Sequence, residues 1–76
     1  MSNAKPIPEN AIKVAWTEYP SRGVSIVWAR DPQSSLTTHY IRVWIGYTPK
    51  DSDALDGTAE EALKHYLRVV QAYAPS

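Results

Sequence analysis

The feature that most constrains this chain is a single amphipathic helix, predicted near the C-terminal end over about residues 58–74. Thr58 begins a capping box, in which its side chain accepts the backbone N–H of Glu61 and the Glu61 carboxylate reaches back to the Thr58 N–H. Pro75 marks the end of the segment. One side is apolar at the helical period, at Ala59, Ala62, Leu63, Tyr66, Val70 and Tyr73. The chain therefore has one helix with one apolar face to bury.

Ahead of the helix, proline and glycine divide the chain into three segments rich in Val, Ile, Trp, Tyr and Thr, a composition typical of strands. These segments span residues 12–19, 24–30 and 38–47. Their short connections favour antiparallel hairpins. We therefore expect a single α+β domain over residues 12–76, a three-stranded antiparallel sheet (a meander) packed on one C-terminal helix, in the order βββα and in two layers. Residues 1–11 are predicted to be an extended arm and residues 48–57 an acidic loop.

One helix can cover only one face of such a sheet, so the other face stays uncovered. In the third segment, Ile41 and Val43 alternate with Tyr40, Arg42 and Trp44, and alternate residues of a strand point to opposite faces. The row of isoleucine and valine belongs under the helix. We therefore expect Tyr40, Arg42 and Trp44 on the uncovered face.

The sequence assigns the faces of the first segment clearly but leaves those of the second segment open. Beneath the helix we expect the apolar row of the first segment, Ile12, Val14 and Trp16. In the second segment two rows compete for the inside, Val24-Ile26-Trp28 and Val27-Ala29. If the shorter row faces the helix, Trp28 and Arg30 join the uncovered face, and a shift of one residue reverses the assignment.

The uncovered face is the candidate binding surface. Large aromatics on an open sheet stabilise it through cross-strand pairs, but Trp, Tyr and Arg are also the residues most enriched at interface hot spots. The candidate set is Tyr40, Arg42, Trp44, Trp28, Arg30 and Arg22. Because the net charge is zero, a protein partner or self-association is favoured over duplex DNA. The sequence therefore predicts a small binding or regulatory module: an inhibitor, an adaptor or a self-associating regulator.

The DNA alternative gains from a resemblance carried by fragments in a fixed order: Arg22–Val24, Ala29–Pro32, Arg42–Gly46, Thr58–Ala62 and Tyr66. They resemble the DNA-binding domain of ethylene-response-factor-type transcription factors and, more distantly, the arm-binding domain of phage integrases. That resemblance implies three strands packed on one helix, with the sheet lying in the major groove. It also implies base and phosphate contacts from the matching positions, Arg22, Arg30, Arg42 and Trp44.

The sequence gives little support for catalysis or metal binding. It has no cysteine, and no nucleophile-elbow, zincin or Walker sequence occurs in it. The acidic segment departs from a calcium loop because its twelfth position is Ala62. His39 and His65 have no third ligand at a useful spacing, and His65 is expected to pair with Glu61. We therefore expect a protein that is not an enzyme and has neither a metal nor a small-molecule cofactor.

Targeting signals are equally scarce. The first ten residues contain one lysine and no apolar run, unlike a signal peptide. The longest apolar runs are too short to cross a bilayer. We expect a cytoplasmic protein that does not enter a membrane.

Overall fold

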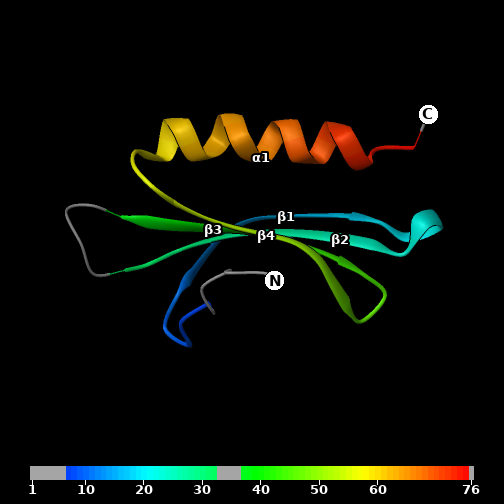
Figure 1. Ribbon diagram of the computed structural model, residues 1–76, viewed down its shortest axis with the longest axis horizontal. Coiled ribbons are helices and arrows are strands. Elements are labelled where there is room, and N and C mark those ends of the chain that lie inside the picture. Colours follow the sequence, from blue (N-terminus) through cyan, green and yellow to red (C-terminus); the bar gives the residue numbers. More distant parts are fainter. Residues whose placement is uncertain (1–6, 33–36, 76) are drawn as a thin grey trace.

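A computed structural model describes residues 7–32 and 37–75 of the chain. One antiparallel sheet of four strands is covered on one face by one helix (Figure 1). The strands are β1 (Ile12–Tyr19), β2 (Val24–Arg30), β3 (Thr38–Ile45) and β4 (Thr48–Asp56), with a short 3-10 helix η1 (Pro20–Arg22) between the first two and helix α1 (Ala59–Tyr73) at the end. Their order across the sheet is β1-β2-β3-β4. The α+β class and the single C-terminal helix are as expected, but the sheet has four strands rather than three.

The fourth strand replaces the acidic loop expected over residues 48–57. β4 pairs with β3 from Thr48 to Asp56, although Pro and Asp are depleted in strands. Pro49 is tolerated because β4 is an edge strand, where a missing backbone donor costs little. Gly46 turns the chain with φ 62, a left-handed conformation that glycine adopts freely. β3 therefore ends at Ile45, two residues earlier than predicted.

Helix α1 begins as a capped helix should. The Thr58 side chain accepts the backbone N–H of Glu61 at 3.2 Å, as in a capping box. The second half of the box differs, because the Glu61 carboxylate accepts the Thr58 hydroxyl rather than its backbone N–H. The cap fixes where the helix leaves the end of β4.

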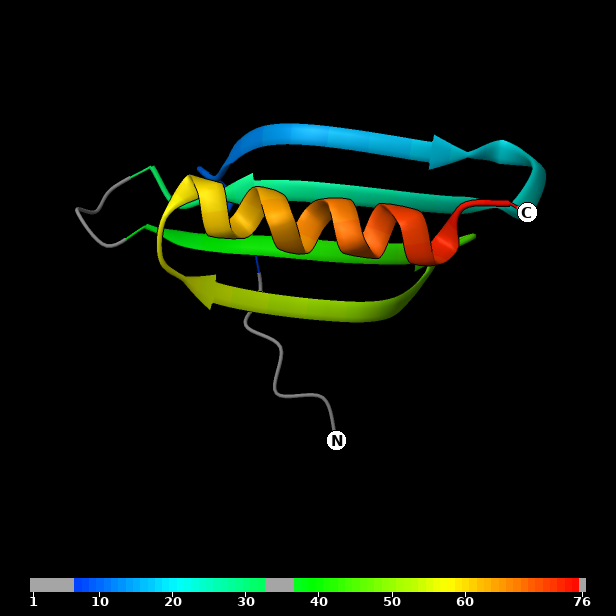
Figure 2. The same cartoon turned by 90° about the horizontal axis from the view of Figure 1, so that it is seen from above.

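The helix lies along the middle of the sheet, over β2 and β3 (Figure 2). Between the two layers lies the apolar core, formed by Val24, Ile26, Trp28, Ile41, Val43, Ala62 and Tyr66. Burial of these side chains supplies most of the favourable free energy that holds the two layers together. No helix in the described part of the chain is long and apolar enough to cross a membrane.

Polar side chains attach the helix to both edge strands. On the β1 side, Tyr19 donates its hydroxyl to the Val70 carbonyl at 3.1 Å, and the hydroxyls of Thr17 and Tyr66 share a hydrogen bond. On the β4 side, Asp53 pairs with His65 at 2.7 Å and Asp51 accepts from the hydroxyl of Tyr73. His65 therefore does not pair with Glu61 as expected. Asp51 and Asp53 of β4 therefore serve as acceptors for the helix, whereas Asp56 accepts from Thr38 of β3.

The described residues ahead of β1, 7–11, lie on the face of the sheet opposite α1 (Figure 1). Within the described residues 7–11, the backbone N–H of Ala11 donates to the Pro8 carbonyl at 3.1 Å and closes a turn. This part of the arm, predicted to be extended, is folded back. The remainder of the expected arm, residues 1–6, lies outside the described residues.

Candidate functional site

The face of the sheet away from α1, here called the open face, carries three rows of four residues. The strand pairings align Lys13-Ala29-Tyr40-Ala54, Trp16-Val27-Arg42-Ser52 and Glu18-Ser25-Trp44-Pro49. Tyr40, Arg42 and Trp44 belong to it because the residues between them, Ile41 and Val43, are buried in the core. The third strand is therefore oriented as the sequence predicts.

Trp28 and Arg30 do not lie on the open face. The Trp28 ring is 5% exposed and lies 5.7 Å from the ring of Tyr66 beneath the helix. Arg30 lies on the same side of β2 as Trp28 and lines a cavity at the start of α1. Of the two orientations of β2 that the sequence left open, the structure has the one that places Trp28 and Arg30 on the helix side, so neither belongs to the candidate surface. The physical cause of this orientation is area: Val24, Ile26 and Trp28 bury more apolar surface than Val27 and Ala29.

Trp16 is a member of the open face that sequence reasoning placed under the helix. The β1–β2 pairing shifts between Lys13 and Ala15, a bulge that reverses the alternation along the rest of β1. Ala15 consequently packs against the core, while Trp16 is 54% exposed, with the Lys13 amine 4.4 Å from its ring centroid. That distance is within reach of a cation–π interaction. Nothing in the sequence marks the bulge.

Arg42 lies at the centre of the open face, between Val27 and Ser52 in the same row. Its Nε and Nη2 atoms are buried and lack a hydrogen-bond partner in residues 7–32 and 37–75. Burial lowers the pKa of the guanidinium, and the nearby Tyr40 acts in the opposite direction. Since arginine stays charged in proteins, the face contains a cation with two unsatisfied donors, which a carboxylate or a carbonyl can accept.

The open face is not equally accessible along its length. Tyr40 is 5% exposed, and residues 7–11 pass beneath this end of the sheet (Figure 1). Trp44 is half-buried at the other end, two residues before the β3–β4 turn. We call Trp16, Val27, Arg42 and Trp44 the indole half of the open face. Within this half Trp16 is exposed, while Val27, Arg42 and Trp44 are half-buried.

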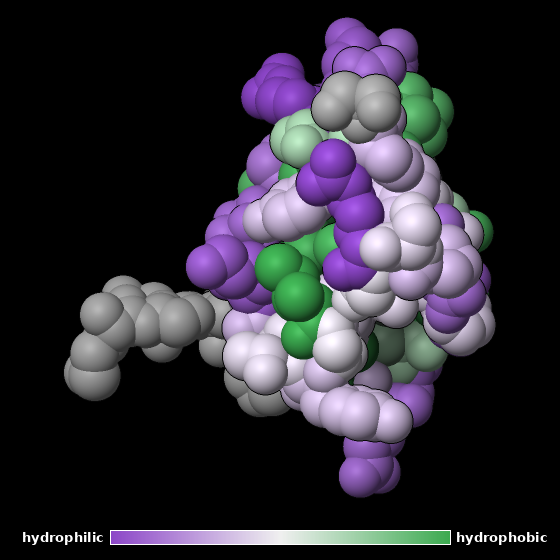
Figure 3. Space-filling model, turned by 90° about the vertical axis from the view of Figure 1, so that its right-hand side faces the viewer, coloured by the Kyte–Doolittle hydropathy of each residue, from purple (hydrophilic) through white to green (hydrophobic). Residues whose placement is uncertain are grey.

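The adjoining end of the molecule carries η1 and the β3–β4 turn. In Figure 3 the surface of this end is mostly white or purple, of intermediate or hydrophilic character, around a smaller green, hydrophobic group. Tyr47 is fully exposed in the turn, and Ile45 is partly exposed beside it. Arg22, the last residue of η1, is exposed. Arg22 is thus at the opposite end of the sheet from the cavity that Arg30 lines.

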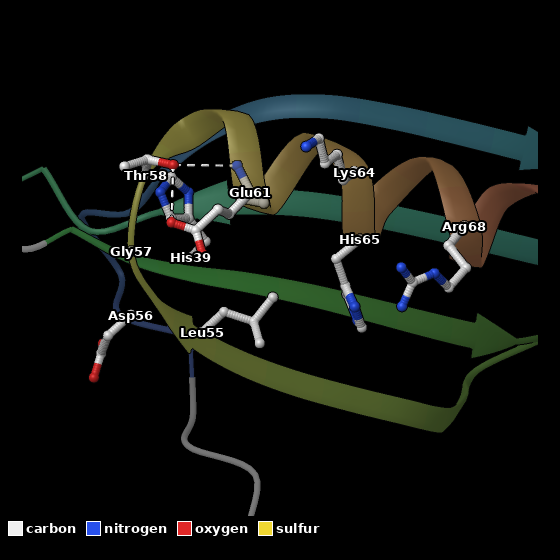
Figure 4. A pocket seen from close by; sticks show the side chains of 10 residues that line it. His39, Leu55, Asp56, Gly57, Thr58, Glu61, Lys64, His65 and Arg68 are labelled. Carbon is white, nitrogen blue, oxygen red and sulfur yellow. Dashed lines mark hydrogen bonds between the residues drawn. The ribbon is translucent and has the colours of Figure 1, made fainter.

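On the helix side, two cavities of about 300 and 510 Å³ meet at the start of α1. They share His39, Gly57, Thr58 and Glu61 (Figure 4). No group of three or more potential metal-ligating side chains occurs among the residues that the structure describes. These cavities escaped sequence reasoning because they depend on β4, which places residues 55–58 against the helix.

No protein-family model matches the sequence, and neither the curated proteins nor the solved structures contain a significant match. The resemblance to ethylene-response-factor-type domains therefore stays a prediction. Of the positions it carries over, only Arg42 and Trp44 share a surface, because Arg30 lies on the helix side and Arg22 at the η1 end. What the fold and site define is a two-layer α+β module with one partly uncovered sheet face.

Proposed function

We propose that this protein is a small, non-enzymatic binding module of the cytoplasm that holds a protein partner on the indole half of its open face. The observation that carries the proposal is Arg42, whose Nε and Nη2 donors are buried without an acceptor. A buried donor left unpaired costs about 1–3 kcal/mol. A partner that supplies the acceptor recovers this cost, so the isolated protein is prepared for a complex.

The side chains around Arg42 define the chemistry of the partner. Trp16 and Trp44 offer apolar area with one polar group each, while Ser25 and Ser52 leave space between the large side chains. Tryptophan and arginine are among the residues most enriched at interface hot spots. The complementary surface is a carboxylate or a free carbonyl flanked by apolar side chains.

Charge favours a protein over nucleic acid. The open face holds Lys13 and Arg42 against Glu18, and the chain as a whole is neutral. Affinity for DNA depends on neutralising several phosphates at once. Two cations opposed by one acid supply little of that attraction, so duplex DNA is the weaker candidate.

The test compares two variants, one that truncates Trp44 and one that truncates Tyr47. Partners captured from host extract are identified, and Kd is then measured with the purified partner. Trp44→Ala is expected to weaken binding by about 2 kcal/mol or more, roughly 30-fold in Kd. Tyr47→Ala is the matched control, since its ring is fully exposed in the neighbouring turn; it should leave Kd unchanged.

Two results would overturn the proposal. One is a Trp44→Ala protein that binds as tightly as the wild type, which would place the interface elsewhere. The other is a salt-sensitive gel shift with duplex DNA at low salt that Arg42→Ala abolishes, because steep salt dependence is the mark of phosphate contacts.

A further inference from the structure

His39 is a buried histidine whose tautomer the structure fixes. The Trp28 Nε1–H donates to His39 Nδ1 at 3.0 Å. An indole nitrogen can only donate, so Nδ1 must hold the lone pair and Nε2 must carry the proton. The side chain is 1% exposed, and Nε2 has no hydrogen-bond partner within the described residues. His39 is therefore a buried, unused donor.

The unused donor is directed at the cavities beside α1. His39 pairs with Arg30 across the β2–β3 ladder, and Trp28 lies two residues nearer the centre of the sheet. Because Nδ1 faces Trp28, Nε2 on the far side of the ring faces the end of the sheet where the helix begins. Both cavities are lined by His39. Figure 4 shows the ring below the first turn of the helix, beside Thr58 and Glu61.

The start of α1 adds donors to the same space. Thr58 caps only the N–H of Glu61, and the N–H of Ala62 bonds to the Thr58 carbonyl. The first N–H groups of a helix, here those of Ala59 and Glu60, have no partner within the helix, and Ala59 lines the larger cavity. The helix start also carries a partial positive charge that favours anions.

Arg30 supplies a full positive charge at the same place. Its side chain lines the larger cavity with His39 and Ala59, and the described structure shows no ion pair for its guanidinium. Against it is the carboxylate of Glu61, which is exposed and held by the Thr58 hydroxyl. The donors outnumber this acceptor, and outward rotation of the exposed Glu61 side chain would, within the described residues, break only the hydrogen bond from the Thr58 hydroxyl.

We propose that the cavity between Arg30, His39 and the start of α1 binds a small molecule through a carboxylate or phosphoryl oxyanion. The anion accepts from His39 Nε2, from the Arg30 guanidinium and from the free N–H groups of the first helical turn. A volume of about 510 Å³ accommodates a small organic acid or a phosphate ester. The site lies on the opposite face of the sheet from Arg42, so it is independent of the proposed partner surface.

The test is an NMR titration of the intact protein at neutral pH and constant ionic strength, with inorganic phosphate and acetate as separate probes. Saturable shifts are expected at the amides of Ala59 and Glu60 and at the His39 Nε2–H, at probe concentrations up to about 50 mM for a millimolar site. A response to phosphate alone identifies a phosphoryl ligand. A response to acetate alone identifies a carboxylate, and a response to both identifies a general oxyanion site.

Variants make the test specific. Arg30→Gln should weaken the response about tenfold, while Arg22→Gln, at the exposed far end of the sheet, should leave it unchanged. Glu61→Gln should strengthen it, because the opposing charge is removed. The proposal is overturned if neither probe shifts these signals, if Arg30→Gln and Arg22→Gln respond alike, or if His39 proves to carry its proton on Nδ1.

Discussion

Along α1, polar side chains of both edge strands bond to the helix, whereas the central cation of the open face, Arg42, has two donors without a partner within the described residues. On the helix side, His39 Nε2 at the start of the helix is likewise unpaired in the part of the chain that the structure describes. Tyr19 reaches the helix backbone, and Asp53 reaches His65 across the layers. Arg42, one strand position away from the core, keeps two buried donors unpaired. Since an unpaired buried polar group in a native structure calls for an explanation, we assign the cross-layer bonds along α1 to stability and the unpaired Arg42 donors to the proposed contact.

The largest expected effect comes from making the same truncation on both faces. Trp28→Ala removes an indole that packs on Tyr66 and donates to His39, and should destabilise the fold by about 3–5 kcal/mol. Trp44→Ala on the open face should cost less than about 1 kcal/mol. Urea unfolding monitored by circular dichroism measures both. Equal losses would remove the distinction between the faces.

Replacing Arg42 should increase the stability of the fold, whereas most mutations decrease it. Arg42→Met keeps a long side chain but removes the two buried donors that lack acceptors. The isolated protein should become more stable by about 1 kcal/mol, since burying an unpaired charged group is unfavourable. The same urea titration provides the measurement. A clear loss of stability would mean that Arg42 serves the fold rather than a partner.

Most of the architecture was predictable, because hydrophobic periodicity determines it. The helix and the first two strands follow strong alternation or a helical period, and only the orientation of β2 was left open. β4 was missed because Asp51 and Asp53 are acceptors for the helix, a role that becomes visible only when the two elements meet. Trp16 was misplaced by the bulge near Val14, and the His39 cavities could not be predicted without β4. The local sequence pattern identifies helices and strands. It does not reveal irregular strand pairing or partners that lie in the other layer.

A smaller effect tests one cross-layer attachment. Tyr19→Phe removes the hydrogen bond to the Val70 carbonyl and should cost about 1 kcal/mol of unfolding free energy. Tyr47→Phe, which alters a fully exposed ring in the β3–β4 turn, is the matched control and should have no effect. Thermal or urea unfolding of the pair gives the difference. If both variants match the wild type, β1 does not depend on this attachment.

The smallest effect is a pH dependence at the other edge. The hydrogen bond to Asp51, together with burial and the charge of Asp51, raises the pKa of Tyr73 above its ordinary value of 10.0. A group whose pKa is raised in the folded state stabilises the fold at pH values below its ordinary pKa. This stabilisation is lost as the pH rises through the folded-state pKa. Wild type should therefore lose slightly more stability than Tyr73→Phe in alkaline solution. Parallel losses from neutral to alkaline pH would contradict this assignment.

The most direct test of the open face is the Kd of the purified partner for the wild type and for Arg42→Met, measured by calorimetry at one salt concentration. If the partner supplies the acceptor for the Arg42 donors, Arg42→Met should bind at least about 30-fold more weakly than the wild type, even though it folds more stably. Equal or tighter binding by Arg42→Met would contradict the assignment of this face as the contact surface.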